Sequence, residues 1–277
     1  MKVAGSTVLL TGASRGIGAV LARELVEKGA RVALTARSAD ELEALASALG
    51  DRAAAVPGDV TKKADRTRML RATEKAFGPP DILINNAGFD EWSPYTALAP
   101  KDIERMIELN LTSTILLTRE ALPGMLERRR GHVLNMASTA GKNMVPFTVT
   151  YSATKHAVIG FTLSLRAELA GTGVSASVVA PGYVKGAGMY ERDWGSKTPM
   201  GTVTTVEKVV AKTVQAIERD RPEVTVSGVL TKVSDVVLAM SPRLTYAIGN
   251  KAAYPMLRKE AERREALRAS GERDVPN

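Results

Sequence analysis

The sequence predicts a doubly wound α/β domain, in which a mostly parallel sheet lies between two layers of helices. Short aliphatic or β-branched runs recur along the chain, with helix-like stretches between them. These runs are apolar almost throughout rather than alternating, as expected for strands that are buried on both faces of a parallel sheet. The chain has 277 residues, 44% of them hydrophobic, which is enough material for one large core.

Seven apolar runs are the expected strands. In chain order they read TVLLTG, RVALTA, AAAVPG, DILINN, HVLNMA, SASVVAPG and EVTVSG. Two of the segments between them show a clear helical pattern. Residues 16–28 carry apolar side chains at helical spacing and stop before Gly29, and residues 39–49 stop in the same way before Gly50. Strand and helix therefore alternate, which favours parallel pairing.

The domain organisation changes near residue 229. Beyond that point the pattern becomes proline-punctuated amphipathic helix, which finishes in the charged segment KEAERREALRASGERD. There is no internal repeat, low-complexity tract or interdomain linker. We interpret residues 1–228 as the main α/β domain and residues 229–277 as a helical C-terminal extension of the same domain, with frayed last residues.

Composition excludes several classes of site and partner. The chain contains no cysteine, so disulfides, thiolate metal ligands and a cysteine nucleophile are excluded. No apolar run approaches the roughly 18 residues of a membrane span, and no cleavage site follows the apolar start, so we expect a cytoplasmic protein. The net charge of +8 is diffuse, and aromatic residues, only 4% of the chain, are not interleaved with basic ones. Nucleic-acid binding is therefore not expected. The basic run at residues 128–130 is interpreted as a solvated helix end.

A glycine-rich stretch, TGASRGIG at Thr11 to Gly18, lies between the first expected strand and the first helix. This is the crevice in which α/β sheets bind ligands. Gly12 permits a tight turn, Gly16 lets the backbone approach a pyrophosphate, and Gly18 allows close helix packing. The spacing is GxxxGxG rather than the common GxGxxG. Taken alone, such a motif is equally consistent with a purely conformational role.

Two arginines indicate which dinucleotide the crevice holds. An acidic residue after the second strand binds a ribose hydroxyl of NAD, but this chain has Ala36 followed by Arg37. Arg15, in the glycine loop, is a second guanidinium within reach of the same place. Guanidinium groups match phosphate geometry, so the pattern favours NADP(H) over NAD(H). The alternative is that both are ordinary surface arginines.

Five motifs in order along the chain carry a family resemblance. They are TGASRGIG, NNAG at residues 85–88, Ser138, YSATK at residues 151–155, and PG at residues 181–182. With these motifs the chain resembles the classical short-chain dehydrogenase/reductase family over about residues 5–230. The resemblance implies a Rossmann-like sheet of seven parallel strands, and hydride exchange between a nicotinamide and a carbonyl or alcohol.

The resemblance also assigns roles to individual residues. It implies that Asn110, Ser138, Tyr151 and Lys155 are catalytic. Asp59 corresponds to the position that contacts adenine, and the NNAG motif steadies the sheet and lines the cofactor. The full set of implied cofactor contacts is Gly12, Ser14, Arg15, Gly16, Ile17, Gly18, Arg37, Asp59, Val60, Asn86, Ala87, Gly88, Tyr151, Lys155, Pro181, Gly182 and Val184.

The residue types fit the implied chemistry. Reduction of a carbonyl leaves negative charge on oxygen, so one group must donate a proton and another must hold the oxygen. Tyr151 is the expected donor and Ser138 the expected holder. Residues four apart on a helix share a face, so Lys155 can place an ammonium near Tyr151 and favour its phenolate. The family resemblance implies that the lysine also holds the nicotinamide ribose, and that Asn110 holds a water that relays protons.

One position departs from the family pattern. The family often has a threonine four residues after the glycine of PG, where it contacts the nicotinamide carboxamide, but this chain has Gly186. The backbone of Val184 is the expected substitute, so we expect altered loop order rather than lost activity. His132 and His156 are the only histidines, and they provide neither a catalytic triad nor a metal site.

Substrate contacts are expected from three segments: residues 89–95, 139–147 and 183–203. Their apolar members predict a lipophilic pocket, and glycines in the third segment predict a lid. The candidates for the pocket are Phe89, Trp92, Met144, Val145, Phe147, Met189, Tyr190 and Trp194. Some of these side chains are alternatively expected only to pack the lid. The extension at residues 229–267 is predicted to narrow the pocket or to contact another subunit; membrane association through its helix is a less favoured alternative.

Together these features predict an NADP(H)-dependent reductase that acts on a lipophilic ketone, such as a 3-oxoacyl thioester. The family implies a homodimer or homotetramer through the helices near residues 112–129 and 151–171. Two alternatives stay open at this point. One is a catalytically silent NADP(H)-binding sensor or interaction protein, and the other is an alcohol dehydrogenase that works in the oxidative direction.

Overall fold

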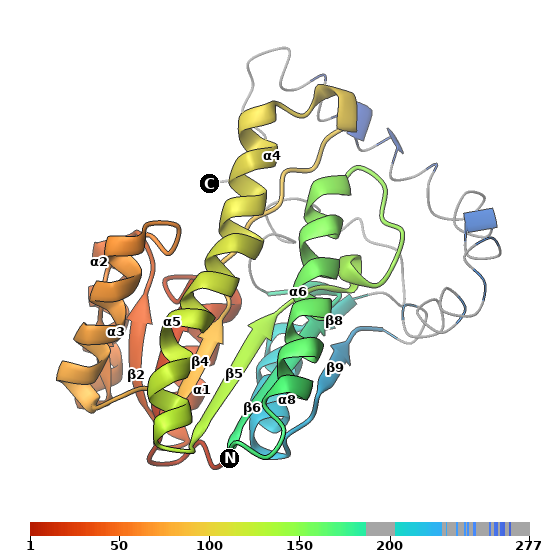
Figure 1. Cartoon of the computed structure of the whole chain (residues 1–277). Helices are drawn as coiled ribbons and strands as arrows, with labels where there is room; N and C mark the ends of the chain where they lie inside the picture. The colour runs from red at the N-terminus through yellow and green to blue at the C-terminus, as the bar shows by residue number, and fades with distance from the viewer. Residues whose placement is uncertain are drawn as a thin grey trace.

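The computed structural model describes residues 1–186 and 203–228, together with scattered positions between 231 and 266. It contains a seven-stranded sheet of strand order β3-β2-β1-β4-β5-β6-β9, in which every pair is parallel (Figure 1). The strands are β1 (Thr7–Thr11), β2 (Arg31–Thr35), β3 (Ala53–Ala55), β4 (Ile82–Asn85), β5 (Gly131–Met136), β6 (Val174–Pro181) and β9 (Glu223–Val226). All seven predicted strands are thus confirmed.

Helices cover both faces of this sheet (Figure 1). One face carries α1 (Gly16–Glu27), α2 (Ala39–Leu49) and α8 (Val206–Glu218), and the other carries α3 (Lys63–Phe77), α5 (Ser113–Glu127) and α6 (Val149–Glu168). A short helix, α4 (Pro100–Ile107), continues through a π-helical segment, η3 (Glu108–Thr112), into α5. Three single turns are η1 (Gly50–Arg52), η2 (Tyr95–Ala97) and η4 (Thr139–Gly141), and a small parallel pair joins β7 (Tyr183–Lys185) to β8 (Val203–Thr205).

Two hydrophobic cores fill the spaces between the sheet and its helices. Successive residues of one strand enter different cores: Leu10 packs with the α1, α2 and α8 side chains, whereas Leu9 packs with those of α3 and α5. In β4, Ile84 and Leu83 divide in the same way. Side chains of a strand alternate between the two faces of its sheet. An apolar residue is therefore required at every position, which explains the continuous apolar runs.

The predicted helix boundaries agree closely with the structure. The helix expected over residues 39–49 has those limits, and the one expected over 16–28 ends at Glu27. Gly29 follows with φ of 88°, a left-handed conformation that favours glycine. Arg128 caps the end of α5, and residues 128–130 are exposed, as expected for a helix end.

The C-terminal extension, predicted over residues 229–277, lies almost wholly outside the described residues. Ala261 is an exception, because its side chain is buried in a cluster with Trp92. Within the parts of the chain that the structure describes, no helix is both long and apolar enough to cross a membrane.

The strand order reverses between β1 and β4, so the carboxyl ends of these strands border the crevice that α/β folds use for ligands. A buried polar ladder fixes this region. Asn85 donates from Nδ2 to Oδ1 of Asn135 over 2.8 Å and to Oγ1 of Thr118 over 3.0 Å. Asn135 in turn donates to Oγ1 of Thr162 over 2.9 Å. The ladder joins β4 and β5 to α5 and α6, and thereby fixes the helices that carry the site residues.

Candidate active site

The glycine turn between β1 and α1 is closed so tightly that side chains are excluded. Gly12 and Gly16 have φ of 65° and 59°. A Cβ added to Gly18 would overlap the carbonyl oxygen of Gly12. The side chain of Asn86 donates from Nδ2 to the carbonyl oxygens of Thr11 and Gly12, each over 3.0 Å. The NNAG motif therefore braces the turn, as the sequence predicts.

Thr11 anchors the same motif from the other side, although sequence reasoning did not single it out. Its Oγ1 accepts hydrogen bonds from the backbone nitrogens of Asn86, over 2.9 Å, and Ala87, over 3.0 Å. A threonine at the end of a buried strand gives no such signal by itself, because its partners lie more than seventy residues away. Thr11, Asn86 and Ala87 thus hold the carboxyl ends of β1 and β4 together.

Both candidate phosphate-binding arginines are exposed at the rim of this crevice. Arg15 stands directly before α1 and Arg37 directly follows β2. The two residues that follow β2, Ala36 and Arg37, include no carboxylate; the first acidic side chains come later, in the first turn of α2. Both residues therefore lie at the carboxyl-terminal edge of the sheet, and their contact with a phosphate stays a prediction.

Lys155 and Tyr151 lie side by side near the N-terminus of α6. Tyr151 is 8% exposed and Lys155 is 4% exposed. The ammonium nitrogen of Lys155 is 5.5 Å from the centroid of the Tyr151 ring, and it donates to the carbonyl oxygen of Met136 over 2.9 Å. Ser138 follows β5; its Oγ donates to the carbonyl of Pro181 over 3.4 Å and accepts from the nitrogen of Ala140 over 3.1 Å. The two residues of the YSATK motif therefore lie together, and Ser138 is hydrogen-bonded to Tyr151.

Burial dominates the acid–base properties of this pair. It raises the pKa of Tyr151 well above its ordinary value; the negative charge of Asp90 raises it further, while a hydrogen bond with Ser138 lowers it. Burial lowers the pKa of Lys155 to about 8, and Asp90 opposes that shift. Tyr151 is also in the first turn of α6, where the helix dipole favours negative charge.

Asn110 lies in the π-helical segment η3 and clamps the chain that follows the NNAG motif. Its Oδ1 accepts from the backbone nitrogen of Phe89 over 2.9 Å, and its Nδ2 donates to the carbonyl of Phe89 over 2.9 Å. Nδ2 is also 3.3 Å from Oγ1 of Thr154 on α6. A Cβ on Gly88 would lie 3.0 Å from Oδ1 of Asn110. The side chain is thus engaged by the protein itself, and its role in a proton relay stays a prediction.

Asp59 and the PG loop occupy the same edge of the sheet. Asp59 accepts from both the nitrogen and the hydroxyl of Thr61, over 3.0 and 2.8 Å, and shapes the loop after β3. Val60, Pro181 and Val184 are buried, and Gly182 follows β6. Gly186 has φ of 86°, which disfavours threonine and gives a physical reason for the departure at this position.

An apolar wall, formed by two adjoining clusters of side chains, lies beside Tyr151. Trp92 and Phe147 lie with ring centroids 6.0 Å apart, and Val145, Tyr183 and Ala261 pack with them. Phe89 packs with Tyr151 in an adjoining cluster. All three segments that were expected to contact substrate are represented here. Met189, Tyr190 and Trp194 lie outside the described residues.

Comparison with known proteins decides the family. The family model described as short chain dehydrogenase matches residues 6–196. The chain belongs to the short-chain dehydrogenase family. Enzymes of this family are oxidoreductases with a nicotinamide cofactor, so the dehydrogenase has the general activity that its motifs predict.

Relatives and solved structures agree with this family. The chain is 38% identical to the ketoacyl reductase HetN of Nostoc sp. over 246 residues, which cover 86% of both proteins. It is 37% identical to the 3-oxoacyl-[acyl-carrier-protein] reductase FabG of Vibrio cholerae over 185 residues, 67% of this chain and 76% of that protein. A variant of actinorhodin polyketide ketoreductase solved with NADPH has a TM-score of 0.76 and 31% identity, with 83% and 98% of the two chains covered. A 3-ketoacyl-(acyl-carrier-protein) reductase from Brucella melitensis solved with NADH has a TM-score of 0.73 and 28% identity, with 81% and 97% covered.

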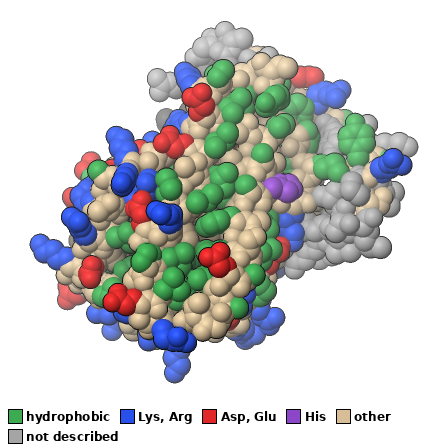
Figure 2. All heavy atoms as spheres, viewed as in Figure 1, with side chains coloured by type: hydrophobic (Ala, Val, Ile, Leu, Met, Phe, Trp, Pro, Cys, Tyr) green, Lys and Arg blue, Asp and Glu red, His purple; other side chains and the backbone are tan. Residues whose placement is uncertain are grey.

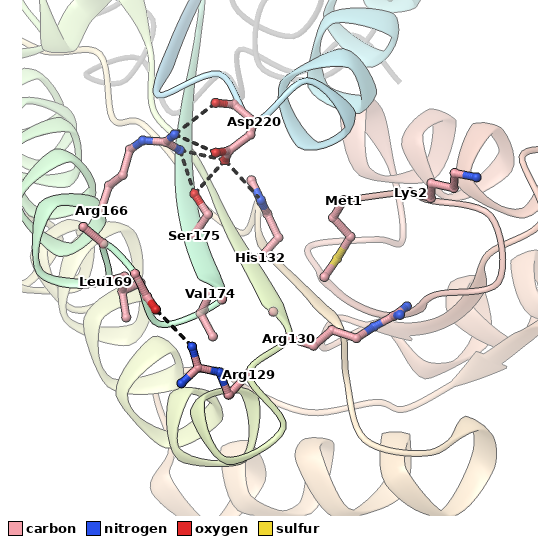
Figure 3. A pocket seen from close by; sticks show the side chains of 14 residues that line it. Met1, Lys2, Arg129, Arg130, His132, Arg166, Leu169, Val174, Ser175 and Asp220 are labelled. Atoms are coloured by element: carbon pink, nitrogen blue, oxygen red, sulfur yellow. Dashed lines mark hydrogen bonds and ion pairs between the residues drawn. The ribbon is translucent and has the colours of Figure 1, made fainter.

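A pocket lies at the opposite, amino-terminal end of the dehydrogenase sheet (Figure 3). Its volume is about 650 Å³. Figure 3 shows Asp220 surrounded by Arg166, Ser175 and His132. Arg166 makes two 2.8 Å bonds to the Asp220 carboxylate, and Ser175 donates to it over 2.6 Å. This cluster ties α6 and β6 to the end of α8.

His132, Ser177 and Asp220 have the residue types of a hydrolytic triad, yet their contacts are structural. Nε2 of His132 is 3.0 Å from Oγ of Ser177, and Nδ1 is 4.0 Å from Oδ1 of Asp220. Ser177 is completely buried and donates its own proton to the carbonyl of Arg221 over 2.5 Å. A substrate carbonyl could not reach that hydroxyl, so the set does not act as a nucleophile.

His132 should make the stability of the dehydrogenase depend on pH. Burial lowers its pKa from 6.5 to about 4. Between these two values the unfolded chain binds a proton that the folded chain does not. The contribution of neutral His132 to the free energy of unfolding is therefore fully present above pH 6.5. It is lost as pH falls towards 4, which lowers the free energy of unfolding by up to about 3 kcal/mol. Urea unfolding at a series of pH values should show this loss in wild type and a flatter profile in His132→Gln. His156→Gln, at an exposed histidine, is the matched control; an unchanged slope in His132→Gln would contradict the assignment.

Proposed function

We propose that the protein is an NADP(H)-dependent reductase that converts a lipophilic ketone, such as a 3-oxoacyl thioester, to a secondary alcohol. The observation that carries this proposal is the meeting of Ser138, Tyr151 and Lys155 beside the glycine turn, at one edge of the sheet. Ser138 and the YSATK pair come from separate motifs, and the fold brings them together. The relatives named as ketoacyl reductases support the ketone as the substrate class.

The residues at the crevice fit a nicotinamide dinucleotide. Gly12 and Gly18 leave no side chain over the turn, so a pyrophosphate can approach the backbone nitrogens at the start of α1. Gly88 similarly keeps the space in front of Asn110 open. The adenine would be held by Asp59 and Val60, and the ribose of the nicotinamide by Tyr151 and Lys155. When bound, the reduced nicotinamide supplies the hydride.

The side chains then manage the proton and the negative charge. Ser138 donates a hydrogen bond to the carbonyl oxygen of the substrate, which fixes its position. The hydroxyl of Tyr151 gives its proton to that oxygen as negative charge develops there. The ammonium of Lys155 stabilises the phenolate that remains, and so offsets the burial that raises the pKa of Tyr151.

The two exposed arginines support NADP(H) as the cofactor. A 2′-phosphate at the end of β2 would meet Arg37 directly and Arg15 from the glycine turn, whereas a carboxylate at this place would repel it. We expect NADPH to bind at least about tenfold more tightly than NADH, and Arg37→Ala to remove most of this difference. Titration of intrinsic fluorescence with each nucleotide measures both affinities.

Arg23→Ala, at a residue of α1 that belongs to none of the implied contacts, is the control for that titration. The Arg23→Ala variant should prefer NADPH over NADH to the same extent as wild type. Equal affinity of wild type for NADPH and NADH would contradict the phosphate site, and a panel of carbonyl compounds would then be tested as substrates with NADH as well as with NADPH.

The apolar wall supports a lipophilic substrate. Trp92, Phe147 and Tyr183 come from three different segments of the chain and pack together beside Tyr151. Burial of an acyl chain of a few carbons against such a wall contributes about 0.8 kcal/mol per methylene. A series of 3-oxoacyl thioesters of increasing length should therefore show a rising kcat/KM, and a flat series would favour a smaller ketone.

Oligomer formation is proposed through the face that α5 and α6 present. Figure 2 shows apolar side chains gathered over this face, between charged borders. Leu126 is 37% exposed and Val149 is 49% exposed, although both are large and apolar. A patch of this kind commonly marks a contact between subunits. Light scattering after size exclusion should give the mass of a dimer or tetramer, and Val149→Glu should lower it.

A further inference from the structure

We propose that the Asp90 carboxylate is the counter-charge that keeps Lys155 protonated inside the catalytic pocket. Asp90 is therefore a positioning residue, which acts on the reaction through Lys155. The inference rests on the proposed function for its consequence in turnover, but the electrostatic contact can be tested without turnover.

Lys155 lies in surroundings that do little to stabilise its charge. Its side chain is almost completely buried, and the acceptor that the structure gives its ammonium is the carbonyl oxygen of Met136. A carbonyl dipole replaces only part of the hydration that a buried ammonium loses. The charge would be lost near neutral pH without a negative group close by. Among the described residues, Asp90 is the charged group whose field reaches both Lys155 and Tyr151.

The fold holds the backbone around Asp90 firmly. The residue before it, Phe89, is bonded through both backbone groups to the side chain of Asn110. The ring of Phe89 packs in the cluster that contains Tyr151. Gly88 brings the chain so close that a Cβ there would lie 3.5 Å from the Lys155 nitrogen. Oδ1 of Asp90 is buried. The backbone next to Asp90 is thus held close to Lys155, and one oxygen of its carboxylate is shielded from solvent.

Other charged groups around the pair do not fill this role. Arg105, on α4, lies with its guanidinium carbon 4.5 Å from the centroid of the Phe89 ring, and its charge has the same sign as that of Lys155. Lys142, after η4, is paired with Glu223 over 2.6 Å. His156 is adjacent in the sequence but exposed, and its Nδ1 lies 2.9 Å from the carbonyl of Ser152.

The charge of Asp90 helps catalysis through Lys155 but opposes it through Tyr151. Its charge favours the ammonium of Lys155, which the reaction needs, but it disfavours the phenolate of Tyr151. The net effect depends on pH. Near pH 8, where Lys155 titrates, the loss of Asp90 should remove the ammonium. In acidic solution Lys155 stays charged in either case, and the same loss should be tolerated.

The direct test is an NMR titration of protein labelled at lysine Cε, because this carbon reports the protonation of its own nitrogen. The Lys155 signal is the one that is absent from Lys155→Arg. In wild type it should titrate at about pH 8. In Asp90→Asn the midpoint should fall by about one pH unit. In Asp90→Glu, which keeps the negative charge, the midpoint should stay close to the wild-type value. An unchanged midpoint in Asp90→Asn would overturn the proposal.

Glu91→Gln is the matched control, since it removes the neighbouring carboxylate, which is not among the charges that act on the pair. Its Lys155 midpoint should equal that of wild type. Asp90→Ser provides a second neutral variant if Asp90→Asn does not fold, as judged by circular dichroism.

The consequence for turnover is measured separately. The alkaline limb of the kcat profile should move about one pH unit lower in Asp90→Asn, with rates near those of wild type below pH 6.5. If wild type reduces no carbonyl of the panel, the proposed function fails while the NMR result still decides the role of Asp90. A titration that shifts without any change in the kcat profile would overturn the claim that Asp90 acts on the reaction.

Discussion

Replacement of Tyr151 by phenylalanine is expected to lower ketone reduction by about a thousandfold or more. The change removes one oxygen, and with it the only proton donor that the proposed mechanism places against the substrate oxygen; general acid catalysis of this kind contributes about 10² to 10⁴ in rate. Tyr151 is nearly buried in an apolar cluster with Met106 and Ala140. The phenyl ring keeps those contacts, so stability should change little, and the loss of one hydrogen bond to the nicotinamide ribose should weaken NADPH binding by about tenfold at most.

Steady-state kinetics with NADPH and a 3-oxoacyl thioester measure the first effect, and nucleotide titration measures the second. Tyr246→Phe is the control, because it makes the same chemical change at an exposed tyrosine. If Tyr151→Phe retained more than about a tenth of wild-type turnover, the proton donor would have to be sought elsewhere.

Gly18→Ala is expected to have the largest effect on stability. The added methyl group would overlap the carbonyl oxygen of Gly12 and crowd Nδ2 of Asn86, which would lie 2.8 Å away. Both groups belong to the braced turn and cannot move independently. Overpacking against a rigid backbone costs about 3 kcal/mol or more. Urea unfolding should therefore show a much lower midpoint, and nucleotide binding should be lost with the turn.

Gly160→Ala is the control for that substitution, since it adds the same methyl group in α6, where nothing in the chain lies within 4 Å of it. Alanine is the better helix former, so this variant should be more stable by up to about 1 kcal/mol. Equal unfolding midpoints for the two variants would show that the tight turn does not explain the glycine.

The fold was predictable because the residues of each strand favour the same structure locally that the buried parallel sheet requires. Each strand of the seven needs apolar side chains on both faces, and this requirement leaves a visible run in the sequence. The pair of Tyr151 and Lys155 was also predictable, because four-residue spacing on a helix fixes their relative position. Arg15 and Arg37 follow from the position of the loops, although their preference for a phosphate stays a prediction.

The rest depends on contacts between distant segments. The π-helical turn at Asn110 has no local pattern, because helical segments of both kinds share one composition. The ladder from Asn85 to Asn135 joins residues fifty positions apart, and each is unremarkable alone. Asp90 resembles any loop carboxylate until Asn110 fixes the backbone beside it. Gly186 was a departure in the sequence, and only its backbone conformation supplies a reason for it.

The two ends of the sheet serve separate purposes, and this has a consequence for engineering and evolution. The amino-terminal cluster around Asp220 should govern stability in acid, whereas the proposed substrate site lies at the carboxyl-terminal edge, a strand length away. Substitutions at sites this far apart, without shared partners, combine additively. Substitutions at the amino-terminal end could therefore raise stability in acid while others at the carboxyl-terminal edge change substrate selectivity. Neither set should cancel the effect of the other.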